Sequence, residues 1–322
     1  MIAPPAAPLP YPSGWRRAFA LRHSMADFGR RGFRDEPVAT RCALEAVART
    51  FLDGFNAELA SPAGAAPDFT AVATQRRGFA VEGAGMAAVL LDTLRPAGGQ
   101  RLAILRAAYD DQYSYLIQVG VGWAMAKLHS RRPLDSTTDA PLLRWLAYDG
   151  MGFCQAFFAG RRGLRRWYAH PSRCPDTCDI GYQGMGRCLW FRACGDPDVL
   201  AGCVAGLPER HRGDAWSGIG LAACYAGSVA PDVYPRLLDR SGVHAPALAQ
   251  GVAFAAEAWR HCGYAPEHAH TAVRTLAGVS LEEAAAWTWT ARRGLDGPDT
   301  GPAGYRQWRL RIQEQAAAVA HQ

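Results

Sequence analysis

The chain has 322 residues, of which 49% are hydrophobic and 20% are charged, with a formal net charge of +6 at pH 7. This composition excludes an intrinsically disordered chain, and a modest charge without a long Lys/Arg run argues against a nucleic-acid-binding protein. No apolar run approaches the ~20 residues of a membrane-spanning helix, and the N-terminus lacks the pattern of a secretory signal. We therefore expect a cytoplasmic protein without a membrane span.

In chain order, residues 1–22 are rich in Pro and Ala and are predicted to form a flexible arm. A first helix is predicted after residues 35–37, where two acidic residues and a Pro fit a helix start. Further along, Pro-containing helix starts alternate with Gly-containing turns, which predicts pairs of helices. Residues 23–291 are expected to form a single helical-repeat domain, and residues 292–322 a C-terminal extension with a terminal helix.

A short run of small residues recurs throughout the predicted domain. Its copies end at positions 48, 85, 122, 152, 186, 220 and 253, so successive copies are 37, 37, 30, 34, 34 and 33 residues apart. Copies at a near-constant step indicate stacked supersecondary units. We therefore predict an all-α fold, an α/α helical-repeat superhelix (solenoid) of about seven units with a period of about 30–37 residues.

Most copies contain paired glycines. Gly costs a helix about 1 kcal/mol relative to Ala, so its recurrence at one place in each unit needs a physical reason. The interpretation we favour is close approach, because two helix backbones without side chains between them can pack tightly. Dinucleotide-binding turns are disfavoured, because β-branched strands do not precede most copies. The sequence contains no GxSxG, P-loop or HExxH motif, so no cofactor is predicted.

One column of the repeat carries polar residues among small and apolar neighbours. Three positions before the end of each copy stand Glu45, Glu82, Val119, Asp149, Gln183, Ser217 and Gln250. The preceding position holds Gln118, Tyr148, Tyr182 and Trp216 in four of the copies. Equivalent positions of a superhelix project along one surface, so this column predicts a polar ladder lined with rings along a groove or tunnel.

Two interpretations of this column remain open. In the first, its members cap helices or form hydrogen bonds across the seam between units. In the second, Glu82 and Asp149 are catalytic acid/base groups, because a carboxyl among rings can have a raised pKa. The substrate-binding residues would then be Glu45, Gln118, Tyr148, Tyr182, Gln183, Trp216, Ser217 and Gln250.

The nine cysteines are an odd number, which is typical of reduced thiols in a cytosol. Cys174 and Cys178 share a predicted loop, with Cys188 and Cys194 further on. A structural zinc site usually has tighter CxxC pairs at both ends. We therefore predict no metal site.

Several phrases of the sequence resemble the bacterial DUF1702 family, whose members include the UnbL proteins encoded with enediyne polyketide synthases. The phrases are residues 32–33, 77–86, 119–124, 143–150, 184–191, 216–222 and 248–251, and the resemblance extends over about residues 25–290. It implies a role in natural-product biosynthesis, of an enediyne or a related polyketide. It implies no particular reaction and no catalytic residue.

The leading hypothesis combines this resemblance with the polar column. The protein would bind a long apolar polyketide or polyene intermediate in a helical tunnel and promote its cyclisation or isomerisation by acid/base chemistry, without a cofactor. The alternative is a non-catalytic helical-repeat scaffold or carrier, which would bind a companion biosynthetic protein or shield a reactive intermediate.

Overall fold

The computed structural model describes residues 9–94, 99–130, 134, 141–158, 160–169, 175–297 and 299–320. Within these ranges every regular element is a helix, which confirms the predicted all-α class. The α-helices are α1 (Phe28–Arg31), α2 (Val38–Ala60), α3 (Thr74–Thr93), α4 (Arg101–Leu128), α5 (Leu146–Phe158), α6 (Gly160–Tyr168), α7 (Cys178–Arg192), α8 (Pro197–Ala205), α9 (Glu209–Tyr225), α10 (Val233–Ser241), α11 (Ala245–His261), α12 (Glu267–Ala277), α13 (Leu281–Arg292) and α14 (Pro302–Ala320). Four short 3-10 helices are η1 (Gly14–Phe19), η2 (His23–Ala26), η3 (Leu143–Trp145) and η4 (Gly242–His244).

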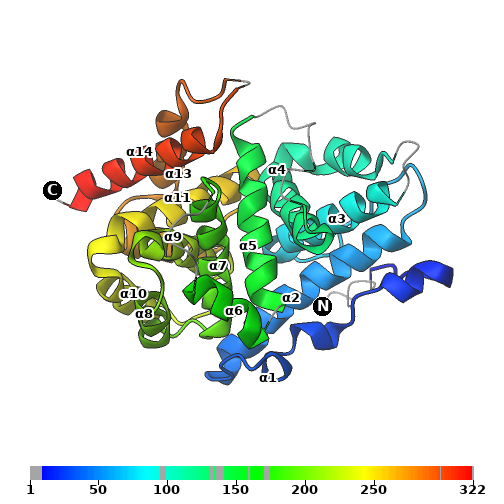
Figure 1. Cartoon of the computed structure of the whole chain (residues 1–322), viewed down its shortest axis with the longest axis horizontal. Coiled ribbons are helices and arrows are strands. Elements are labelled where there is room, and N and C mark those ends of the chain that lie inside the picture. The colour runs from blue at the N-terminus through cyan, green and yellow to red at the C-terminus, as the bar shows by residue number, and fades with distance from the viewer. Residues whose placement is uncertain are drawn as a thin grey trace, which may run out of the picture.

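The helices that carry the repeat pack against one another in chain order. The contacts run from α2 to α3, α4, α5, α7, α9 and α11, and then to α13. Figure 1 shows α5 running between α2–α4 on one side and the later helices on the other. The shorter helices α8, α10 and α12 contact one another in series, and α14 packs on α11 and α13. This order of contacts is what a stack of repeated helical units requires.

The stack also bends back on itself. Helix α4 contacts α11, although α5, α7 and α9 lie between them in the series. The Tyr115 hydroxyl donates a hydrogen bond to Glu257 Oε1 at 3.1 Å, and Ser114 Oγ lies 3.2 Å from His261 Nε2. Because the two arms of the stack meet here, the inner faces of the repeat helices look toward one another across the middle of the molecule.

The repeated glycines are the points where neighbouring backbones touch. A Cβ added to Gly184 would lie 1.8 Å from the carbonyl oxygen of Asp149, and one added to Gly218 would lie 1.8 Å from that of Gln183. Equivalent contacts with the preceding unit occur at Gly83, Gly120, Gly150 and Gly251. Any side chain would force these helices apart, so the predicted role of the glycines in close helix approach is confirmed.

These contacts also correct the register of the first unit. Gly83 packs on the carbonyl of Phe51, just as Gly184 packs on that of Asp149. Phe51 therefore occupies the position in α2 that Glu82 occupies in α3, and the assignment of Glu45 to the column is wrong. The first unit was misaligned because α2 has a single Gly at its seam, Gly54, whereas several later copies have a pair of glycines that fixes their register.

The first described residues lie along α2. Arg16 donates hydrogen bonds to the carbonyls of Leu59 and Ser61, and the Asn56 amide pairs with both backbone groups of Leu21. Of the helices described, none is long and apolar enough to cross a membrane. The predicted boundaries at residues 22 and 291 stay a prediction.

Candidate functional site

The polar column is realised in the later units as one buried hydrogen-bonded ladder. Gln183 Nε2 donates to Asp149 Oδ2 at 2.8 Å. The Ser217 hydroxyl lies 2.8 Å from Gln250 Oε1 and 3.4 Å from Gln183 Oε1. These four side chains are fully buried, and Arg309 of α14 donates from Nε to Gln250 Oε1 at 3.2 Å. These contacts join α5, α7, α9, α11 and α14 at the buried seam, and the four side chains do not line either cavity described below.

The other predicted binding residues also have structural partners. Glu45 Oε1 accepts from the backbone N–H of Phe28 and so holds α1 against α2. The remaining members are buried, and their contacts are Gln118 with Arg106, Tyr182 with the Trp167 carbonyl, Tyr148 stacked on Trp145, and Trp216 within the core cluster. None of these residues lines either cavity described below. The seam interpretation therefore fits these members better than a ligand site does.

Glu82 departs from this pattern because it faces an apolar cavity, here named cavity A, of about 50 Å³. Cavity A is enclosed by η2, α2, α3, α4, α5, α7 and α9, and most of its large lining side chains are aromatic: Phe51, Phe79, Trp123, Phe153, Phe157, Phe158, Phe191 and Tyr225. Glu82 and Arg187 are the charged residues among its described lining. One buried water needs about 10–15 Å³ by this measure, so the cavity is narrow.

The Glu82 carboxyl is held in place by one directional contact. Trp123 Nε1 donates to Glu82 Oε1 at 2.8 Å. Burial raises the pKa of Glu82 to about 7, against the opposing effects of the Arg187 charge and the Trp123 hydrogen bond. At neutral pH both the acid and the carboxylate are therefore present in useful amounts, which is the condition for general acid–base chemistry.

Arg187 stands between two carboxyl groups. Its Nη2 lies 3.7 Å from Glu82 Oε1, and its Nε lies 3.1 Å from Asp149 Oδ1. The first distance is too long for a hydrogen bond, and the second contact lacks hydrogen-bond geometry at both atoms. The guanidinium also lies 4.9 Å from the centre of the Phe153 ring. Burial raises the pKa of Asp149, and the Arg187 charge opposes that rise.

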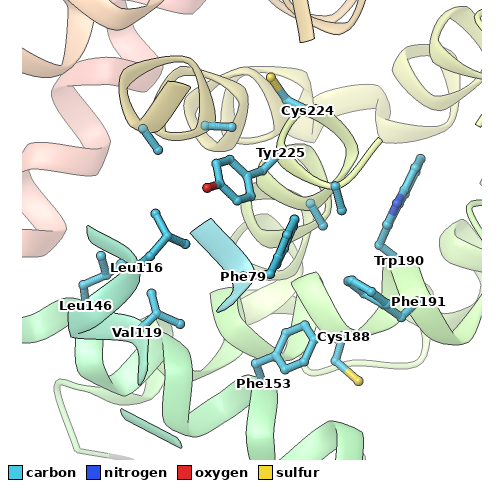
Figure 2. Close-up of a cluster of buried hydrophobic side chains, with 14 of the residues drawn as sticks. Phe79, Leu116, Val119, Leu146, Phe153, Cys188, Trp190, Phe191, Cys224 and Tyr225 are labelled. Carbon is cyan, nitrogen blue, oxygen red and sulfur yellow. The ribbon is translucent and has the colours of Figure 1, made fainter. Parts of the chain in front are cut away.

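A second narrow cavity, cavity B, lies on the other side of Arg187. It also has a volume of about 50 Å³ and is enclosed by α4, α5, α7, α9, α11, α13 and α14. Arg187, Leu221 and Tyr225 line both cavities. In Figure 2 the Tyr225 oxygen points toward the side of Leu116, Val119 and Leu146, which line cavity B. Phe79, Phe153 and Phe191, which line cavity A, lie farther to the right.

The cavity-lining residues follow a column that sequence reasoning missed. Trp123, Phe153, Arg187, Leu221 and Phe254 stand four residues after the polar column, and Phe157, Phe191, Tyr225 and Ala258 stand eight after it. Residues four and eight apart share one face of a helix, so this face continues from the ladder into the central space. With the first unit counted from Phe51, Arg187 is the one charged residue at the first of these positions; counted from Glu45, as the sequence suggested, Arg49 also falls there.

The thiols do not form an obvious site. Cys174 lies outside the described residues, and Cys178 begins α7. Over the ranges that the structure describes, no group of three or more His, Cys, Asp or Glu side chains could hold a metal ion. Burial raises the pKa of the Cys188 thiol to about 12, which makes it a poor nucleophile.

Comparison with known proteins gives one match. The sequence model of a family described as "Protein of unknown function (DUF1702)" matches residues 13–316, nearly the whole chain. No curated protein and no solved structure matches the chain.

Proposed function

The chain belongs to the DUF1702 family, and from this premise and the geometry of cavity A we propose that it acts on an elongated apolar intermediate of natural-product biosynthesis. The intermediate is of the enediyne or related polyketide type that the sequence resemblance implies. Glu82 transfers protons during its cyclisation or isomerisation. The observation that carries the proposal is a single carboxyl with a pKa near 7 in a narrow, aromatic-lined cavity.

The two proton transfers assigned to Glu82 cancel within one turnover. As a carboxylate Glu82 removes a proton from a carbon beside a carbonyl group, which leaves an enolate, and in its acid form it returns that proton to another position of the intermediate. The residue thus ends as it began, as cyclisation or isomerisation requires. Arg187 stabilises the negative charge that develops on oxygen between the two transfers.

Asp149 has a different part in this proposal from the one that sequence reasoning predicts. It is fully buried and lines neither cavity, so no ligand in those cavities reaches it. Its carboxyl instead lies beside Arg187 and accepts a hydrogen bond from Gln183. We assign Asp149 the positioning of Arg187 and leave proton transfer to Glu82 alone.

The narrow cavities favour a small-molecule ligand over the docking of a companion protein. Most of their lining side chains are buried, and a volume of about 50 Å³ suits a slender molecule better than a protein side-chain surface. The non-catalytic alternative that this geometry supports is a carrier that shields an apolar intermediate. A carrier and an enzyme share the cavity and differ in whether Glu82 must titrate.

The test replaces Glu82 with Gln in a producing strain that lacks its own copy of the gene. Gln keeps an oxygen for Trp123 Nε1 but does not titrate. We expect product formation to fall by about 10²–10⁴-fold while the protein stays folded. Glu58→Gln is the matched control, because burial also raises the Glu58 pKa to about 7 but the residue pairs with Arg101 away from both cavities.

Full product formation by a folded Glu82→Gln protein would eliminate the acid/base role. If Ala222→Phe, which fills cavity A, still abolished product in that case, the carrier function would be the better account. Loss of product in both Glu82→Gln and Glu58→Gln would indicate a general effect on folding and not on chemistry.

A further inference from the structure

Cavities A and B meet at a small set of shared residues, and two of these bear polar groups with unused hydrogen-bonding capacity. Arg187 and Tyr225 are both more than nine-tenths buried. Leu221, the third shared residue, is only partly buried and is apolar. The junction is therefore the one place where the described linings of both cavities offer hydrogen-bond donors to the same ligand.

The Tyr225 side chain is fixed by its neighbours on three sides. Its ring stacks on Trp259 with centroids 4.5 Å apart and meets the edge of Phe79 at 5.1 Å. A Cβ added to Gly78 would lie 2.1 Å from the Tyr225 hydroxyl oxygen, so that oxygen rests directly against the α3 backbone. The ring cannot move far without disturbing these contacts, and its hydroxyl is held at the junction.

The hydroxyl nevertheless lacks a partner. Across the described part of the chain, the Tyr225 oxygen forms no hydrogen bond, and Figure 2 shows it pointing away from Phe79 toward the Leu116 side. The Tyr225 hydroxyl oxygen is not among the fully buried atoms that lack a partner, so it borders the cavity space and is open to a ligand. A ligand oxygen at the junction would satisfy this donor.

Arg187 supplies the second donor. It is held by charge between Glu82 and Asp149, but neither contact has hydrogen-bond geometry. Arg carries five N–H donors in a planar fork. Its Nε has no hydrogen-bond partner and its Nη2 lies 3.7 Å from Glu82 Oε1, so the guanidinium has donor capacity left for a ligand acceptor.

We propose that Arg187 and Tyr225 form a binding site for a carbonyl oxygen in the middle of one elongated apolar ligand that spans both cavities. This inference rests on the proposed function and names its substrate class, a long-chain ketone or polyketone with apolar arms on either side of the carbonyl. The arms lie in cavities A and B, and the carbonyl oxygen accepts hydrogen bonds at the junction. Glu82, beside Arg187, is then within the same local group as the polarised carbonyl.

The test compares three unbranched C17 probes that differ in one feature: 9-heptadecanone, 2-heptadecanone and heptadecane, each delivered from cyclodextrin. Dissociation constants are measured on the full chain by tryptophan fluorescence, for which Trp123 in cavity A is a reporter. We expect 9-heptadecanone to bind about 10-fold more tightly than heptadecane, with 2-heptadecanone in between. Tyr225→Phe, which removes only the hydroxyl oxygen, should abolish most of that difference.

Two filling variants test whether one ligand spans both cavities. Ala222→Phe narrows cavity A and Ala258→Phe narrows cavity B. Both variants should weaken the binding of 9-heptadecanone, whereas binding of a ligand confined to one cavity would be weakened by only one of them. If a filling variant fails to fold, the Tyr225→Phe comparison still decides the matter, because that change leaves packing nearly unaltered.

The outcomes separate this inference from the proposed function. Equal binding of all three probes by the wild type would overturn the carbonyl site and leave the apolar ligand cavity standing. An undiminished preference for 9-heptadecanone in Tyr225→Phe would remove Tyr225 from the site. Failure of the wild type to bind any of the three would count against the proposed function itself.

Discussion

Replacing Gly218 with Ala tests whether backbone contact at the seam holds the repeat helices together. The added Cβ would lie 1.8 Å from the Gln183 carbonyl oxygen and 2.7 Å from the Arg187 nitrogen, both in the backbone of α7. Ordinary contact distances are about 3.5–4.0 Å, so α7 and α9 must separate by roughly 2 Å. Overpacking of this kind costs ~1–3 kcal/mol and occasionally more.

An opposing effect must be subtracted from that cost. In an unhindered helix, Ala is more favourable than Gly by about 1 kcal/mol. Because the obstacle at Gly218 is backbone and not the movable end of a side chain, we place the strain at the upper end of its range. The expected net loss in the free energy of unfolding is about 2 kcal/mol.

The assay is urea denaturation followed by circular dichroism at 222 nm. Gly202→Ala in α8 is the matched control, because Gly202 is exposed and a Cβ there would have no neighbour within 4 Å. That variant should be as stable as the wild type or gain up to about 1 kcal/mol. If Gly218→Ala were stabilised like the control, the seam would not be a tight contact and the close-approach reasoning would fail.

Three further predictions follow from the buried polar groups. Folding raises the Glu82 pKa from 4.5 to about 7, so the stability that protonated Glu82 contributes is lost as pH rises from 4.5 through 7. Glu82→Gln does not titrate, so its free energy of unfolding relative to the wild type should change by about 2–3 kcal/mol between pH 4.5 and 8 in urea titrations. Parallel pH profiles of the two proteins would refute this. Arg309→Met breaks a buried ion pair and should cost about 3 kcal/mol, against less than about 1 kcal/mol for the half-exposed Arg306→Met. A thiol reagent should label exposed Cys42 at once and Cys188 only on unfolding, which mass spectrometry after limited labelling would show.

Much of the fold could be predicted because the same backbone contact recurs in successive units and requires the same residue type each time. A glycine at the same place in successive helices is costly unless the backbones touch there, and the contacts at Gly184 and Gly218 show that they do. The first unit was misaligned because α2 forms its seam with a single glycine, Gly54, and the carbonyl of Phe51 carries no chemical signature in the sequence. A residue that contributes only its backbone carbonyl to a contact can be of any type, so the sequence does not reveal the contact.

The candidate site was predictable only in part. Sequence reasoning placed Glu82 and Asp149 in one class, since both occupy the same repeat position, but their surroundings differ. The unit after Glu82 has Val119 at that position, so the ladder is interrupted there and Glu82 turns to Trp123 and the cavity. Asp149 has Gln183 as its neighbour and is closed into the ladder. Whether a carboxyl joins the ladder or faces the cavity depends on the residue at the same position of the next unit, and comparing residues at one repeat position does not show this.

The position of Arg187 is the strongest reason to look for a ligand in the middle of the stack. The equivalent residues in other units are apolar, among them Trp123, Phe153 and Leu221, and pack without difficulty. Replacing a whole buried charge cluster with apolar residues of similar volume is often neutral or stabilising, so stability alone gives no reason to place Arg187 and its two carboxyls here. The fold instead places two carboxyls beside it, yet leaves its Nε without a hydrogen-bond partner. A buried charge that is retained at such cost, at the junction of two narrow apolar cavities, is best explained by an acceptor that the ligand brings with it.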